Sequence, residues 1–319
     1  MGIDRRKALL AAFFAVVVWG ASFVATKLAL RYTNPAAVVW LRFTMGVVIL
    51  GLAVMKGRLF ELPDKKDWLY FALWGCLGIT FHQWLQSTGL LTSQATTTAW
   101  IVASTPIFMV LLGWLVLAEK PLWLQLLGIL LSTCGVLLVV SRGHLADLAS
   151  GRFGTPGDFL ILLSSLNWAV FSILSRRGLK KYPATLMMFY VMVFGWLFSS
   201  IWFLVNGGQV HMSAIPWDGW AGIAFLGIFC SGFAYIFWYG ALKALPVAQT
   251  GAFLYLEPLV TVLVAAVILK EQVTLAAFLG GVLILVGVWL VNRRAAQDSM
   301  GLSDFPAALV TMGHSDPGE

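Results

Sequence analysis

The sequence alternates long apolar runs with short polar breaks along almost its whole length. A helix of roughly 20 apolar residues crosses about 30 Å of hydrocarbon, and ten runs have this length. They cover residues 8–30, 36–55, 67–88, 95–117, 121–140, 157–176, 184–205, 217–241, 248–269 and 273–292. In lipid every backbone polar group has to be satisfied within the protein, so these runs predict transmembrane α-helices.

The composition indicates the same solvent. Of the 319 residues, 60% are hydrophobic and 11% are charged, whereas an ordinary soluble domain carries about 25% charged residues. The three cysteines, Cys76, Cys134 and Cys230, lie inside predicted spans and have neither disulfide-framework nor metal-site spacing. The sequence therefore predicts a membrane protein with no metal and no cofactor.

The basic residues predict how the helices are oriented. Lys and Arg favour cytoplasmic loops, and an N-terminus inside the cell places 15 of the 21 basic residues on the cytoplasmic side. We therefore predict a multi-pass protein of a bacterial cytoplasmic membrane, with both termini cytoplasmic. Because this sorting accounts for the net charge of +7, the charge does not indicate a nucleic-acid partner.

The chain also contains an internal duplication. Four positions in each half recur at a constant offset of 152 residues: Pro106, Glu119, Gly128 and Gly135, then Pro258, Glu271, Gly280 and Gly287. The front of each half agrees as well, with Trp19, Lys27 and Pro35 matched by Trp168, Arg176 and Pro183. Such a repeat has to be considered before any single motif, because it changes the architecture.

Each half contains five spans, an odd number, so the second copy enters the membrane from the opposite side. Inverted repeats are typical of secondary transporters, whose binding site lies near the midplane between the repeats. We expect an all-α integral membrane protein with ten transmembrane helices as two inverted five-helix repeats. The repeats are predicted at residues 8–140 and 157–293, with a linker at 141–156 and a disordered cytoplasmic tail at 294–319.

These positions carry a resemblance to a known family. The Trp19-Gly20 pair with Lys27, together with the duplicated Pro–Glu–Gly–Gly series, resembles the two tandem EamA domains of the drug/metabolite transporter (DMT) superfamily over about residues 8–293. The resemblance implies a central cavity built mainly from spans 1, 3, 4, 6, 8 and 9, with spans 5 and 10 towards the periphery. It also implies a carrier, since members mostly export amino acids, related metabolites or drugs.

The repeated motif residues have structural interpretations beside functional ones. Glycines seven residues apart share one helix face and favour static packing or a homodimer contact, with a sliding surface as the alternative. Glu119 and Glu271 end spans 4 and 9, where a carboxylate caps the next helix or couples ions. Pro106 and Pro258 predict mid-span kinks, which would shape a cavity.

Ionisable residues at membrane depth are costly and are therefore functional candidates. Glu257 would bind an ammonium group or carry a proton; a pair with Arg42 or a neutral hydrogen-bonded acid is the alternative. His82 is a second candidate for proton coupling, or else a packing residue. Arg42 is also expected close to the outer interface, and Lys27 anchors to headgroups or captures a carboxylate.

Polar and aromatic residues define the candidate substrate cavity. Residues 82–98 are unusually polar and predict an aqueous vestibule on the outer side. Aromatic faces with a few polar groups suit an amphipathic solute, whereas helix or lipid packing is the alternative for each ring. The candidate cavity residues are Trp19, His82, Gln83, Gln86, Thr97, Trp100, Asn167, Trp168, Tyr235, Trp238, Tyr239, Phe253, Tyr255 and Glu257.

Missing motifs narrow the function. The sequence has no phosphate-binding P-loop, zinc-protease motif or nucleophile elbow, so neither an ATP-driven pump nor an enzyme is supported. We expect a secondary transporter that exports amino acids or related amphipathic compounds, aromatic ones included, by alternating access. The alternatives are a facilitated-diffusion carrier without ion coupling and a membrane-embedded enzyme acting on lipid. The expected partners are a small-molecule solute and membrane lipids.

Overall fold

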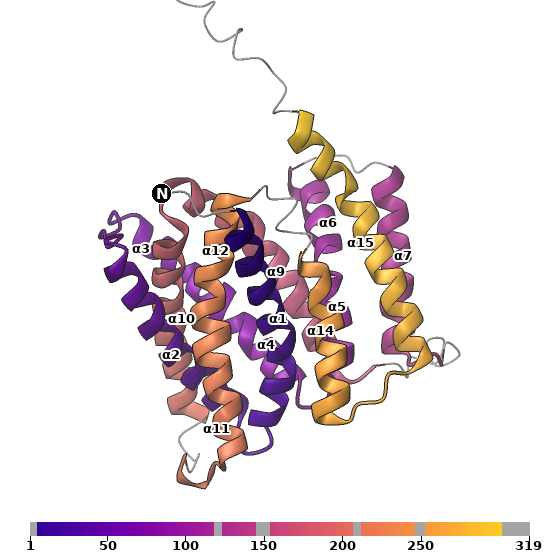
Figure 1. Ribbon diagram of the computed structural model, residues 1–319, viewed down its shortest axis with the longest axis horizontal. Helices are drawn as coiled ribbons and strands as arrows, with labels where there is room; N and C mark the ends of the chain where they lie inside the picture. The colour runs from indigo at the N-terminus through magenta and orange to yellow at the C-terminus, as the bar shows by residue number, and fades with distance from the viewer. Residues whose placement is uncertain (1–4, 118–122, 145–153, 207–211, 246–252, 302–319) are drawn as a thin grey trace, which may run out of the picture.

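The computed structural model describes residues 5–117, 123–144, 154–206, 212–245 and 253–301, and this part of the chain is helical, without a β-strand (Figure 1). The α-helices are α1 (Arg5–Ala29), α2 (Pro35–Lys56), α3 (Asp67–Trp74), α4 (His82–Gly89), α5 (Ala95–Ala103), α6 (Thr105–Leu117), α7 (Trp123–Val140), α9 (Pro156–Lys181), α10 (Ala184–Asn206), α11 (Trp217–Ala224), α12 (Ala234–Ala244), α14 (Leu256–Val264) and α15 (Leu275–Gly301). The π-helices are η1 (Gly75–Phe81), η3 (Phe225–Phe233) and η5 (Ala265–Leu269), and the 3-10 turns are η2 (Met212–Ala214) and η4 (Phe253–Tyr255).

Length and composition make six helical stretches of the described part capable of crossing a membrane, and two shorter apolar helices accompany them. This agrees with the predicted all-α membrane protein. The prediction of a disordered tail from residue 294 is wrong at its start, because α15 continues to Gly301. Ala295, Ala296 and Gln297 all favour a helix, so nothing in the sequence ends it at the predicted membrane surface.

The two repeated prolines have different surroundings. Helix α5 ends at Ala103 and α6 begins at Thr105, so the predicted break near Pro106 is present. The Val102 carbonyl, which Pro106 cannot bond, accepts a hydrogen bond from Thr105 Oγ1 at 2.6 Å. Pro258 instead lies in the first turn of α14, directly after η4, so the predicted mid-helix kink there is wrong. Proline is tolerated in a first turn because its missing N–H would have no partner there.

Two π-helices interrupt the third and eighth predicted spans at corresponding places. At each π-helix, a glycine allows close contact with the neighbouring helix. A Cβ on Gly75 of η1 would lie 2.6 Å from the backbone nitrogen of Gly195 in α10, and one on Gly46 of α2 would lie 2.8 Å from Cβ of Ser231 in η3. Helix α10 therefore packs on η1 as α2 packs on η3. Such π-turns recur at functional sites.

The repeated glycines bring α7 and α15 together, and these two helices lie side by side in Figure 1. A Cβ on Gly128 would lie 2.5 Å from the Gly287 carbonyl oxygen, and one on Gly135 would lie 2.6 Å from that of Gly280. The backbones therefore touch at both positions. The glycine faces are occupied within the chain, in agreement with the static packing interpretation.

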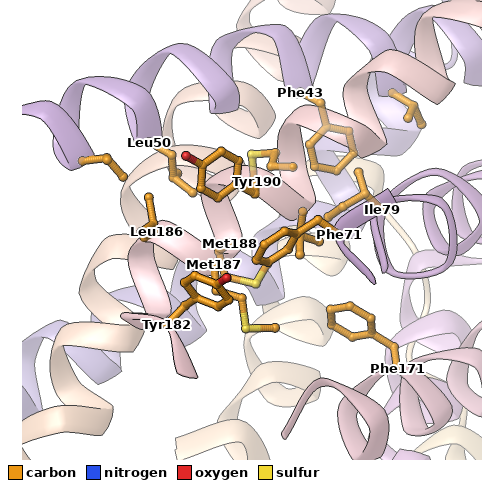
Figure 2. Close-up of a cluster of buried hydrophobic side chains, with 14 residues drawn as sticks. Phe43, Leu50, Phe71, Ile79, Phe171, Tyr182, Leu186, Met187, Met188 and Tyr190 are labelled. Carbon is orange, nitrogen blue, oxygen red and sulfur yellow. The ribbon is translucent and has the colours of Figure 1, made fainter. Parts of the chain in front are cut away.

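A buried apolar core joins α2, α3, η1, α9 and α10 (Figure 2). Its largest side chains include Phe43, Phe71, Tyr182 and Tyr190. The two tyrosine hydroxyls reach the rim of the core, where Tyr182 donates to Asp67 Oδ2 at 2.6 Å and Tyr190 donates to a backbone carbonyl at 2.8 Å. This core fixes α2, α3 and α10 as one packed unit.

Polar contacts mark the two ends of the bundle. At the end where α1 begins, Lys181 forms ion pairs with Asp64 and Asp67. Hydrogen bonds to these two carboxylates raise the pKa of the Lys181 ammonium above its ordinary value. At the opposite end Tyr32 donates to Asp218 at 2.6 Å. Asp64 and Lys181 therefore lie at the same end of the bundle (the top of Figure 1).

Candidate functional site

Aromatic rings from α1 and α12 meet in the interior of the bundle. The Trp19 ring centroid lies 5.6 Å from that of Tyr235 and 5.3 Å from that of Trp238. Its indole Nε1 donates to the Cys230 carbonyl in η3 at 3.2 Å, which holds the ring in place. Tyr239 follows one turn after Tyr235, with the two centroids 6.4 Å apart. Trp19, Tyr235, Trp238 and Tyr239 form what we call the aromatic cluster, and the structure brings them together.

The opposite face of the same helical stretch points outward. The side chains of Phe229, Phe233 and Phe237 are each about two fifths exposed, and their rings follow one another with centroids 6.1 Å and 6.2 Å apart. Tyr235 is two residues from both Phe233 and Phe237, so helical geometry directs it to the other side. This helical stretch therefore has one row of aromatic rings on the outer surface of the bundle and another that faces its interior.

His82 and Trp168 form a second pair, between α4 and α9. Their ring centroids lie 4.8 Å apart, and Trp168 in turn lies 5.1 Å from Phe171 of the apolar core. The buried His82 ring is hydrogen-bonded to the backbone of Ser164, while its Nδ1 has no hydrogen-bond partner in the described part of the chain. The histidine is therefore packed and oriented, with one ring nitrogen left for a proton or a ligand.

Arg42 lies two turns inside α2 and is only 7% exposed, so it is enclosed by neighbouring helices. Its Nε donates to Ser231 Oγ at 3.0 Å, and one terminal nitrogen donates to Gln83 Oε1 at 3.0 Å. The suggested ion pair with Glu257 is not formed, since the ion pairs among the described residues involve only Lys27 and Lys181.

Glu257 lies in the first turn of α14, against α1. Its backbone carbonyl is so close to Gly20 that a Cβ on this glycine would lie 2.7 Å away. The Thr261 hydroxyl bridges helices α14 and α1, since it lies 2.7 Å from the Gly20 carbonyl and 3.0 Å from the Glu257 carbonyl. Glu257 as a whole residue is half-buried, and its carboxylate has no ion pair among the described side chains.

Three predicted cavity aromatics lie elsewhere. Trp100 packs on α15, where a Cβ on Gly281 would lie 2.4 Å from its ring. Tyr255 belongs to the same cluster and donates to the Val288 carbonyl at 3.3 Å. Phe253 packs against the cluster where α1 begins and α12 ends. The structure thus places these three rings in packing contacts between helices.

The predicted polar cavity residues are distributed over two places. Asn167 Nδ2 donates to the Leu77 carbonyl at 2.9 Å and so ties α9 to the π-helix η1. Gln86 is half-buried on the same helix as Gln83. Thr97 is buried in the first turn of α5 and lines a pocket at the end of the bundle. The set therefore does not form one cluster: Asn167 and Gln86 lie with α4, η1 and α9, whereas Thr97 lies at the end of the bundle.

A polar network joins the two halves where α1 ends. Glu271, between η5 and α15, accepts hydrogen bonds from the backbone N–H of Ala95 at 2.9 Å and of Thr96 at 3.0 Å, and from the Thr96 hydroxyl at 2.9 Å. Lys27 Nζ lies 3.9 Å from Glu271 Oε1 and donates to the Ser93 carbonyl at 2.5 Å. Glu271 therefore caps α5 of the first half, and not the helix that follows it.

The network extends to the start of α9. The Ser93 hydroxyl donates to Asp158 Oδ1 at 2.5 Å, and the Thr98 hydroxyl donates to Ser93 Oγ at 3.1 Å. Lys27 is thus held by protein groups instead of reaching for headgroups. We call Lys27, Ser93, Thr96, Asp158 and Glu271 the inter-half network; Glu119, the repeat partner of Glu271, lies outside the described residues.

Two pockets open beside this network. One has a volume of about 380 Å³ and is lined by Lys27, Gln94 and Glu271 among others. The second, of about 460 Å³, is lined by Gln94, Thr96, Thr97 and Glu271 among others. The predicted vestibule of residues 82–98 is therefore found for its last part only, while its first part, from His82, lies inside the bundle.

Two residues of these sites, Asp158 and Ser231, were missed in the sequence. The sequence contained a signal for Asp158, because Thr155 and Asp158 have the spacing of a helix capping box. In the structure Asp158 Oδ2 accepts a hydrogen bond from the Thr155 N–H at 2.7 Å, and Thr155 Oγ1 accepts one from the Asp158 N–H at 3.2 Å. Ser231 carried none, since nothing distinguishes it from other serines of the chain before the helices pack.

Comparisons with known proteins agree with this architecture. The sequence profile of the EamA-like transporter family matches residues 6–141 and 155–293. A relative in Archaeoglobus fulgidus, named "Uncharacterized transporter", is 28% identical over 88% of this chain and 96% of its own. A relative in Streptantibioticus cattleyicolor, named "Probable terminal-alkyne amino-acid exporter", is 30% identical over 90% of this chain and 94% of its own.

A solved crystal structure shares the fold. It superposes with a TM-score of 0.65 and covers 92% of this chain and 99% of the other chain. Because the sequence identity is 20%, this likeness concerns the arrangement of the helices alone.

Proposed function

The chain belongs to the EamA-like transporter family, and from this premise we propose that it exports amino acids or related amphipathic metabolites, aromatic ones included, by alternating access. The family assignment confirms the resemblance seen in the sequence. Small-molecule transport, and not catalysis, is what the family and its named relatives support. The amino-acid class is suggested by the name of the relative in Streptantibioticus cattleyicolor.

The observation that carries this proposal is the aromatic cluster with Glu257 beside it. Trp19 comes from the first half of the chain, whereas Tyr235, Trp238 and Glu257 come from the second. Aromatic faces attract an ammonium group, and a carboxylate at membrane depth provides its counter-charge. An amphipathic amine of amino-acid size would bind its apolar part to the rings and its cation to Glu257.

The proposed architecture is ten transmembrane helices in two inverted repeats. Helix pairs match between the halves: α2 packs on η3 as α10 packs on η1, and α1 packs on α12 as α9 packs on α4. The α7–α15 pair contributes one helix from each half. Helix α1 begins and α15 ends at the same end of the bundle, which fits both termini on the cytoplasmic side of a bacterial membrane (Figure 1).

Alternating access requires bonds that exist in one conformation and break in the other. The inter-half network has the required position, since it links α1 and α5 of the first half to α9 and Glu271 of the second at one end of the bundle. We propose that it closes the outer end of the solute path. In the opposite conformation these contacts separate and the outer pockets connect with the aromatic cluster.

Proton coupling is the finer part of the proposal. Glu257 and His82 are the candidate carriers, because each lies inside the bundle with a titratable atom available. Exchange of a proton for the solute would make transport respond to a pH gradient, whereas a facilitated-diffusion carrier would respond only to the solute gradient.

Reconstituted transport tests the proposal directly. Purified protein in liposomes should move labelled L-phenylalanine, L-tryptophan or L-leucine, and Trp19→Ala should raise the KM for the moved solute by about tenfold through lost ring contacts. Trp217→Ala is the matched control, because Trp217 is 85% exposed at the end of the bundle. Absence of transport for the whole amino-acid panel would overturn the proposed solute class.

A further inference from the structure

Arg42 has a guanidinium that is buried without an anionic partner among the described residues, which helix packing alone does not explain. It is 93% buried at membrane depth, where a charged guanidinium is costly unless an anion or a dense set of acceptors stabilises it. Its two hydrogen-bond partners, Ser231 and Gln83, are both neutral. No carboxylate of the described residues pairs with it.

The guanidinium also has donors to spare. It carries five N–H groups, and the contacts to Ser231 and Gln83 use one each. A guanidinium presents its donors as a planar fork, which matches the two oxygens of a carboxylate. The three remaining N–H groups are enough for such a two-point contact.

The side chain is held in position from two helices. Ser231 lies in η3, directly against Gly46 of α2, so the distance between Arg42 and Ser231 is fixed by backbone packing. Gln83 holds the guanidinium from α4. A binding group with its rotamer locked in this way loses little entropy when it takes up a ligand.

Arg42 also neighbours the proposed solute site. Its partner Ser231 directly follows Cys230, whose carbonyl holds the Trp19 indole, and its partner Gln83 directly follows His82. Glu257 approaches the same tryptophan from α14, since its backbone carbonyl lies against Gly20, the residue that follows Trp19. A cation and an anion therefore flank the same aromatic rings without pairing with each other.

We propose that Arg42 binds the carboxylate of the transported solute, so that this transporter selects zwitterionic α-amino acids with an apolar side chain. This inference rests on the proposed function and narrows its solute class. The solute carboxylate takes the free N–H groups of Arg42, its ammonium faces Glu257, and its side chain packs on the aromatic cluster. Compounds that lack the carboxylate leave the buried cation unpaired and bind poorly.

A series of analogues tests this with the unmodified protein. In proteoliposomes, uptake of labelled L-phenylalanine should be inhibited by 3-phenylpropionate, which keeps the carboxylate and lacks the ammonium group. Phenethylamine and L-phenylalaninamide, which lack the carboxylate, should inhibit at least about tenfold more weakly, as expected for a lost charged hydrogen-bond pair. If L-leucine or L-tryptophan is the better solute, the analogues tested are the acid, the amine and the amide derived from that amino acid.

Variants then assign the effect to Arg42. Arg42→Gln should raise the KM for the amino acid at least about tenfold and remove the preference over the amide, whereas Arg42→Lys should retain part of it. Arg5→Gln, at the exposed start of α1, is the matched control. Thermal unfolding in detergent checks that each variant is folded, and the analogue series decides the matter if Arg42→Gln is not.

The outcomes separate the two proposals. If the protein moves amino acids but accepts the amine and the amide equally well, the role of Arg42 is refuted while the proposed function stands. An Arg42→Gln variant that is folded and keeps its preference for the acid also refutes it. If no amino acid of the panel is moved, the proposed function fails and the inference fails with it.

Discussion

Replacement of Glu271 by alanine should open the outer end of the transporter. The carboxylate accepts three hydrogen bonds at the start of α5, two from backbone N–H groups and one from the Thr96 hydroxyl, and lies 3.9 Å from Lys27 Nζ. Its side chain is only 10% exposed, so water screens these contacts little. Glu271→Ala leaves the first N–H groups of α5 and the Lys27 ammonium without this partner.

The size of the effect follows from these contacts. Loss of a helix N-terminal cap costs about 0.5–2 kcal/mol, and a hydrogen bond to a charged group contributes about 1.5–3 kcal/mol, although the terms are not additive. We expect a total of about 3 kcal/mol. If the contacts exist only in the outward-closed conformation, the equilibrium between the two conformations shifts roughly a hundredfold towards the open one.

Cysteine labelling measures this shift. In a background without the three native cysteines, a cysteine at Thr97 should react with a membrane-impermeant maleimide much faster in Glu271→Ala than in the parent protein. Thr97 is 7% exposed and lines the 460 Å³ pocket, so its reactivity reports on opening there. Gln272→Ala is the control, because this exposed neighbour lines the same pocket and has no part in the network.

Two results would refute the reasoning. Equal labelling rates and equal unfolding temperatures in Glu271→Ala and Gln272→Ala would show that the network does not hold the end closed. Lower thermal stability without faster labelling would show that Glu271 only caps α5 and does not control the opening of this end. Glu271→Gln should fall between the parent and the alanine variant, since one amide oxygen replaces two carboxylate oxygens.

Three further predictions concern packing, coupling and the opposite end of the bundle. Gly287→Val should abolish folded protein in a size-exclusion assay, because a Cβ there would lie 2.2 Å from Ser132 Oγ and 2.4 Å from the Gly128 carbonyl oxygen. Val286→Leu, on the exposed face of the same helix, is the control and should leave folding unchanged. A folded Gly287→Val protein would disprove the close contact. Glu257→Gln should uncouple transport from an imposed pH gradient while downhill counterflow persists, and an unchanged pH response would exclude Glu257 as the proton carrier. Lys181→Met should lower the unfolding temperature only slightly, as expected for an exposed ion pair. Hydrogen bonds to Asp64 and Asp67 raise the pKa of Lys181, so the difference in stability between Lys181→Met and the parent should be constant between about pH 7 and pH 10 and should shrink as the pH rises through the folded pKa. A difference that grows at alkaline pH would contradict this sign.

Local patterns were sufficient for the helices and for their packing motifs. Apolar run length predicted membrane-crossing helices because a bilayer fixes how many residues a helix needs, and six helical stretches of the described part are long and apolar enough to cross. The break at Pro106 followed from the missing proline N–H. The spacing of Gly128 and Gly135 indicated a face for close contact. The tail prediction failed at α15 because helix propensity continues past the predicted membrane surface.

Partner choice could not be predicted from the same patterns. Glu271 was recognised as a capping residue, but the helix that it caps begins at Ala95, on the other half of the chain. Trp100 and Tyr255 were assigned to a cavity by residue type and span, and the rotation of their helices places them against α15. Arg42 was placed near the interface by its position in the sequence, although its donors reach Ser231 and Gln83 inside the bundle.

The sequence by itself determined that this protein is an all-helical membrane protein with a duplicated motif, because burial in lipid and helical periodicity are properties of each segment alone. It also contained the aromatic and charged residues from which a solute site would be built. Only the tertiary structure decided which of them meet. The rotation of each helix and the close approach at its glycines are set by all neighbouring helices together, and this joint packing brings Trp19 to Tyr235, Arg42 to Ser231 and Glu271 to α5.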